Sequence, residues 1–146
     1  MALAARLTII GIATALAVGV LLAMAATVFD SRRWGWYAAG NALIAATYAL
    51  LGVLVAPVFG RVAGVFVAFP IPFLDVGTGQ SPTLLGEPAS WASYLPGYGG
   101  YRVLIDGGFT ATFDETGSLL LAVGWIAVLA AAAVVLVRRA IRPSTG

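Results

Sequence analysis

One feature constrains this chain more than any other. Residues 119–137 form a charge-free run, LLLAVGWIAVLAAAAVVLV, and Arg138, Arg139 and Arg142 follow it. At about 1.5 Å rise per residue, a helix of this length spans about 28 Å, close to the thickness of about 30 Å of a bilayer's hydrocarbon core. Arginines beside a span favour the cytoplasmic side of the membrane. The run therefore predicts a membrane-spanning helix whose end is cytoplasmic.

The composition extends this expectation to the whole chain. Of its 146 residues, 61% are hydrophobic and 10% are charged, whereas a soluble domain carries about 25% charged residues. Too few charges remain to cover a surface that faces water. The sequence therefore indicates an all-α membrane protein that forms a single transmembrane domain over residues 1–146 and has a lipid bilayer around it.

The first apolar stretch, residues 7–29, is uncharged between Arg6 and Asp30, and we predict the first span there. The alternative is a cleaved signal peptide within residues 1–25, with a basic start and a small-residue cleavage site. The length of the stretch and the apolar segments after it favour a span. Small residues recur in it at every fourth position, a spacing that favours close helix packing in lipid; they are Gly11, Ala15, Gly19 and Ala23.

Two more spans are expected over residues 36–55 and 58–74, which makes about four transmembrane helices in all. Aromatic residues typical of a membrane interface precede the second span, and Pro57 ends or kinks it. We expect the third span to break near Phe69, because the prolines of the sequence FPIPF cannot continue a regular helix.

Residues 76–118 differ from the spans, since they contain much Gly and Pro and most of the acidic residues. We expect short helices over residues 88–96 and 100–109, which would form a re-entrant or interfacial segment outside the cell before the last span. Within it, Arg102 and Asp106 have the four-residue spacing of a weak local ion pair.

Two further short stretches contain acidic residues, and each has a simple structural explanation. Asp114 and Glu115 precede the last helix, where acidic side chains suit the positive end of the helix dipole. Asp75 and Gln80 flank a Gly-rich stretch. That stretch is either a turn leaving the membrane or a polar site at the outer mouth of a pathway.

The arginines predict the orientation of the four spans. With the C-terminus cytoplasmic, the N-terminus is cytoplasmic too, and five of the eight arginines then lie inside and three outside. The three outer ones are Arg32, Arg33 and Arg102. The sequence therefore predicts a multi-pass protein of the cell membrane with both termini in the cytoplasm.

Missing residue types exclude much chemistry, because the chain has no Lys, His or Cys. It cannot form a P-loop lysine, a Schiff base, a His-based triad or a disulfide, and it lacks the usual zinc ligands. The basic residues are scattered or lie at span ends, which argues against nucleic-acid binding. We therefore expect no enzyme activity, no cofactor and no bound metal.

The order of these parts resembles an ABC transporter permease of type 2, the membrane subunit of many exporters of the bacterial inner membrane. The most family-like stretches are residues 51–73, LGVLVAPVFGRVAGVFVAFPIPF, and 95–107, LPGYGGYRVLIDG. Leu95 and Pro96 match a Leu-Pro motif of the family's outer segment, and Arg102 matches the arginine that follows it. The resemblance covers the last four spans of a family that usually has six.

This resemblance implies a permease subunit that forms part of a translocation pathway and is energised by a separate cytoplasmic ATPase. It also implies pairing with another permease chain, as a homo- or hetero-oligomer. Arg61 would contact the cytoplasmic partner, although an arginine there also fits a simple interfacial anchor. The expected outer gate consists of Pro70, Pro72, Pro96, Tyr98 and Arg102.

The alternative function is a non-transporting assembly or regulatory subunit of a larger membrane complex. The scarcity of ionisable residues inside the predicted spans favours this alternative, because ion and proton pathways usually carry such residues. The sequence does not choose among lipids, glycans, drugs and peptides as cargo.

Overall fold

The computed structural model describes residues 2–80 and 89–141, and this part of the chain is helical without a strand. Three stretches are long and apolar enough to cross a membrane, namely Thr8–Val28, Trp34–Gly60 and Thr116–Leu136, and Phe66–Gly79 is a shorter apolar helix. The predicted all-α membrane fold with about four spans is confirmed. In chain order the elements are α1 (Ala2–Val28), α2 (Trp34–Ala68), α3 (Pro70–Pro72), the π-helix η1 (Phe73–Gly79), the 3-10 helix η2 (Ser90–Tyr94), α5 (Tyr98–Phe109) and α6 (Thr116–Ile141).

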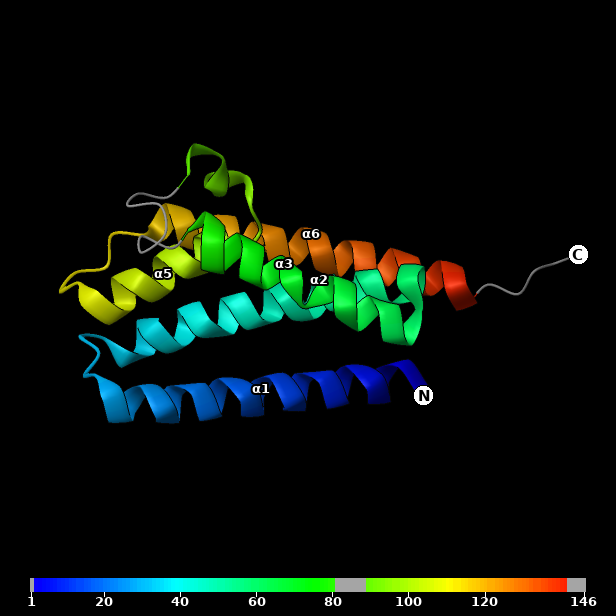
Figure 1. Ribbon diagram of the computed structural model, residues 1–146, viewed down its shortest axis with the longest axis horizontal. Coiled ribbons are helices and arrows are strands. Elements are labelled where there is room, and N and C mark those ends of the chain that lie inside the picture. Colours follow the sequence, from blue (N-terminus) through cyan, green and yellow to red (C-terminus); the bar gives the residue numbers. More distant parts are fainter. Residues whose placement is uncertain (1, 81–88, 142–146) are drawn as a thin grey trace, which may run out of the picture.

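The long helices lie side by side along one axis, and α1 begins at the end of the bundle where α6 ends (Figure 1). Helix α1 packs chiefly against α2, while α2, α5 and α6 pack against one another. The shorter α5 lies along only part of the bundle and runs toward the end where α1 connects to α2 (Figure 1). The core of the bundle is therefore the contact of α5 with α2 and α6.

Helix α2 consists of two antiparallel helices joined at Gly60. This residue has φ 78° and ψ 176°, a backbone conformation that is essentially restricted to glycine. The reversal brings the two halves together, and a Cβ added to Gly64 would lie 3.3 Å from the Cα of Ala56. The helix thus continues past Pro57, and the reversal that we expected in this region falls at the glycine, where the backbone can adopt it.

The turn gives a direct test. We expect Gly60→Ala to lower the free energy of unfolding by about 1–3 kcal/mol, because the added Cβ would strain the backbone. Nothing in the described part of the chain lies within 4 Å of that Cβ, so a clash does not contribute. Gly52→Ala is the matched control, since its Cβ also meets nothing within 4 Å and alanine favours a regular helix. Thermal unfolding in detergent compares the two variants, and equal stability would contradict a strained turn.

The third span stays helical through its prolines. The assigned α2 ends at Ala68, but Phe69 keeps helical angles, φ −65° and ψ −45°, so the expected break near Phe69 does not occur. The chain continues through α3 into the π-helix η1, which ends at Gly79. Of the two alternatives for the stretch after Asp75, the turn is therefore not found there, because the helix continues through this stretch to Gly79.

The segment between the third and last spans contains the two short helices that we expected. Residues 90–94 form η2 and residues 98–109 form α5; residue 88, the predicted start of the first, lies outside the described residues. By contrast, the small residues of α1 do not pack within the chain. All four are exposed, and a Cβ on Gly11 or Gly19 would meet nothing within 4 Å in the described part of the structure.

Candidate functional site

Glycines let α5 approach α2 and α6 much more closely than larger residues would. A Cβ added to Gly40 of α2 would overlap the backbone of Leu104, and one added to Gly107 would lie 2.5 Å from the backbone nitrogen of Tyr37. Gly99 approaches α6 in the same way. Since these neighbours are backbone atoms, side-chain rotation could not relieve the overlap. The position of α5 is therefore tightly fixed by its glycines.

A buried carboxylate lies where the third span meets the start of α5. Asp75 is 4% exposed, and its Oδ2 accepts hydrogen bonds from the Tyr48 hydroxyl at 2.6 Å and from the Gly97 backbone N–H at 2.9 Å. Its Oδ1 accepts a hydrogen bond from Nε2 of the fully buried Gln80. The carboxylate thus links α2, η1 and the residue before α5.

Asp75 accepts three hydrogen bonds, and two of them come from groups that only donate, the Gly97 N–H and the amide nitrogen of Gln80. Among the residues that the structure describes, the ion pairs are Arg33–Asp106 and Arg102–Glu115. Asp75 belongs to neither pair. A buried carboxylate without a cationic partner is costly in a membrane protein and is a marker of function.

The close packing at this carboxylate depends on Gly97. A Cβ at this position would overlap the Tyr48 hydroxyl and would lie 2.8 Å from Oδ2 of Asp75. Any side chain would therefore separate the backbone N–H from the carboxylate. The sequence LPGYGG thus contains a glycine that the site requires, directly after the Leu-Pro motif.

A cavity of about 390 Å³ opens beside Asp75. Most of its wall is apolar, and the hydroxyl of Thr78, the second polar residue, donates its hydrogen bond to the carbonyl of Leu74. The lining residues are Ile71, Leu74, Asp75, Thr78, Trp91, Leu95 and Pro96. The site is therefore an apolar cavity with one charged group, a common form of small-molecule binding site.

Two ion pairs link α5 to the residues that precede α2 and α6. Arg33, just before α2, pairs with the buried Asp106 of α5 at 3.0 Å. Arg102 pairs with Glu115, just before α6, at 2.5 Å. The predicted local pair of Arg102 with Asp106 was therefore wrong, because the two side chains pair with different neighbouring segments.

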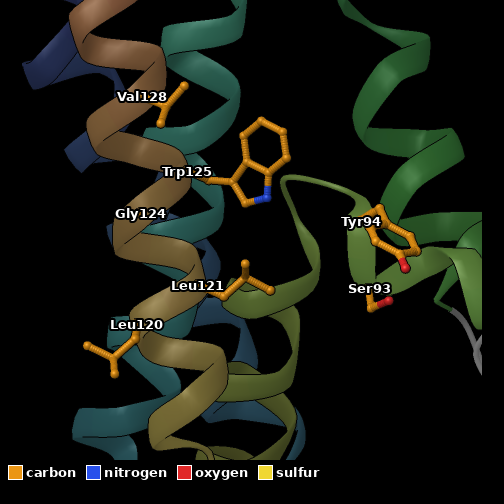
Figure 2. Close-up of a pocket in the computed structure, with 7 residues that line it drawn as sticks. All are labelled: Ser93, Tyr94, Leu120, Leu121, Gly124, Trp125 and Val128. Atoms are coloured by element: carbon orange, nitrogen blue, oxygen red, sulfur yellow. The ribbon is translucent and has the colours of Figure 1, made fainter.

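A second groove, of about 470 Å³, lies between η2 and α6. Figure 2 shows the indole of Trp125 projecting from α6 toward the side where Ser93 and Tyr94 lie. The lining contains no carboxylate and no arginine; it consists of Ser93, Tyr94, Leu120, Leu121, Gly124, Trp125 and Val128. It therefore lacks the charged group that distinguishes the cavity beside Asp75.

The predicted site residues fall in two places. Arg61 follows Gly60 at the reversal of α2, which lies at the end of the bundle where α1 begins (Figure 1). Among the predicted gate residues, Pro96 lines the cavity beside Asp75, and Pro70 and Pro72 lie in α3, just before η1. Tyr98 begins α5, and Arg102 is directed to Glu115 instead of the cavity.

Sequence reasoning noticed Asp75 and Gln80 but missed their partners, the Tyr48 hydroxyl and the Gly97 N–H. The one available signal was that Tyr48 is among the few polar residues of the second span. A scan against protein-family models, a search of curated proteins and a search of solved structures each found no match to the chain.

Proposed function

We propose that this chain is a membrane-spanning permease subunit of an ABC exporter, which forms part of the translocation pathway and is energised by a separate ATPase. The observation that carries the proposal is the outer segment. Two short helices, η2 and α5, lie between the third and last spans, and α5 packs back against α2 and α6. This is the arrangement that the resemblance implies for an outer gate.

The contacts of α5 suit a gate more than a passive loop. Its first turn is linked to the buried Asp75 through Gly97, and its last turn is linked to Arg33 through Asp106. A change in either contact would therefore shift the whole helix relative to the spans. In this proposal α5 moves as a rigid element when the pathway opens, and the chain contributes packing and gating while the ATPase performs the chemistry.

The proposal includes a multi-pass orientation with both termini in the cytoplasm. Helix α1 begins and α6 ends at one end of the bundle (Figure 1), which is consistent with an even number of spans. The exposed Arg138 and Arg139 lie in the last turn of α6, and such residues favour the cytoplasmic side. Arg61 then lies at the cytoplasmic end, within reach of an ATPase.

The contact at Arg61 is testable by co-purification of a cytoplasmic ATPase with this chain from the cells that make it. We expect Arg61→Ala to reduce recovery of the ATPase and Arg61→Lys to preserve part of it, because lysine keeps the charge but loses the bidentate geometry of arginine. Arg32→Ala is the matched control, since Arg32 is exposed and lies between α1 and α2, at the opposite end of the bundle. Equal recovery with all variants would rule out the contact and leave Arg61 as an interfacial anchor.

The second candidate is an assembly or regulatory subunit that packs against a larger membrane complex. The exposed small residues of α1 favour it, because such a stripe suits close approach of another helix. The buried Asp75 argues the other way, since the spans are not free of ionisable groups. Failure of any ATPase to co-purify with the unmodified chain would favour the second candidate.

A further inference from the structure

We propose that the cavity beside Asp75 binds the ammonium group of an amphipathic organic cation, and that such cations are the substrate class of the exporter. The inference rests on the proposed function for its second part only. The binding site itself follows from the charge, the shape and the hydrogen bonding of the cavity.

The negative charge of Asp75 favours a cationic ligand in the cavity. Asp75 is 4% exposed, accepts three hydrogen bonds, and has no cationic partner among the residues that the structure describes. The donors stabilise the ionised carboxylate but leave its charge uncompensated. An ammonium group in the cavity would supply the missing positive charge.

The apolar walls of the cavity favour an organic ligand over a metal ion. Ile71, Leu74, Leu95 and Pro96 offer apolar surface but no side-chain ligand. In the described part of the chain, no group of three or more His, Cys, Asp or Glu residues could hold a metal ion. A volume of about 390 Å³ fits a small aliphatic or aromatic body, and Trp91 at the wall can add a cation–π contact.

A second buried acceptor lies on the residue that donates to the carboxylate. Oε1 of Gln80 is buried and has no hydrogen-bond partner in the described part of the chain, although Nε2 of the same amide donates to Asp75. A buried polar atom without a partner costs stability. Gln80 is buried and is not among the residues that line the cavity, so this oxygen does not select the ligand. Asp75 supplies the charge that an ammonium group would meet.

The site is also coupled to the proposed gate. The same carboxylate oxygen that accepts from Tyr48 accepts from the backbone N–H of Gly97, just before α5. A cation that attracts the carboxylate weakens this bond and loosens the start of α5. Binding in the cavity would in this way favour movement of the outer segment.

Binding of 1-adamantanamine to the purified chain in lipid nanodiscs, without an ATPase, tests the site. We expect saturable binding of the amine and no saturable binding of the neutral analogue 1-adamantanol. Asp75→Asn should weaken amine binding by about tenfold or more, because it removes one partner of a buried charge pair. Asp114→Asn removes the same charge from an exposed position and should leave binding unchanged.

Further variants keep the test decisive if Asp75→Asn fails to fold. Trp91→Leu changes only the cavity wall and should weaken amine binding by about threefold through the lost cation–π contact. Equal binding of amine and alcohol, unsaturable partitioning, or full affinity in Asp75→Asn would each overturn the site. Saturable amine binding without ATP-driven export of the amine would refute the substrate assignment and leave the site standing.

Discussion

Replacing Gly40 by alanine is expected to lower the free energy of unfolding by about 3 kcal/mol, at the upper end of the usual cost of overpacking. The added Cβ would overlap the backbone nitrogen and Cα of Leu104, so the two helices would have to separate. Gly35→Ala is the control on the same helix, because its Cβ would meet nothing within 4 Å in the described structure. Thermal unfolding in detergent, followed by circular dichroism, measures both variants.

The same experiment separates the packing effect from helix propensity. Alanine favours a helix over glycine by about 1 kcal/mol, so Gly35→Ala should be neutral or slightly stabilising. If both variants are equally stable, α5 does not pack against α2 as closely as described.

Loss of the charge on Asp106 is expected to have the second largest effect. Asp106→Asn should lower the free energy of unfolding by about 2–3 kcal/mol, because it leaves Arg33 without its partner in a largely buried pair. The side chain of Asp106 is 9% exposed and that of Arg33 is 22% exposed. Asp114→Asn, on the exposed loop before α6, should change stability by less than about 0.5 kcal/mol.

A double-mutant cycle completes this prediction. Arg33→Gln combined with Asp106→Asn removes both charges and keeps groups that can hydrogen-bond to each other. The double variant should recover a large part of the stability lost in Asp106→Asn, since the unpaired arginine is the main penalty. Additive losses in the cycle would show that the two residues act independently and would contradict the pair.

The spans could be predicted from the sequence because each depends on a local property, a long run of apolar residues. The prolines of the sequence FPIPF predicted a break near Phe69, but Phe69 keeps helical angles and the chain continues as a helix. The extension of this helix to Gly79 could not be predicted from the sequence. A Gly-rich stretch favours a turn when it is taken alone, and the bonds that hold Asp75 come from Tyr48 and Gly97, far away in the sequence.

The ion pairs show the same limit of local reasoning. Arg102 and Asp106 have the spacing of a helical pair, but the buried face of α5 carries Asp106 and directs it to Arg33. Glu115 was expected to stabilise the start of the last helix. It lies directly before that helix and accepts a hydrogen bond from the Ser118 hydroxyl in the first turn, but its pairing with Arg102 was not expected. One sequence alone does not give the partners that tertiary packing supplies.

The glycine-lined contacts of α5 have a consequence for biosynthesis. Its 12 residues are fewer than the roughly 20 that a membrane helix needs, and they include an arginine and an aspartate. The helix therefore depends on packing against other elements, chiefly α2 and α6, and α6 is made after it. Helix α5 can dock on α2 as soon as it is made, but its contacts with α6 form only after α6 has entered the bilayer. The packing of α5 is therefore completed in two steps, first against α2 and then against α6.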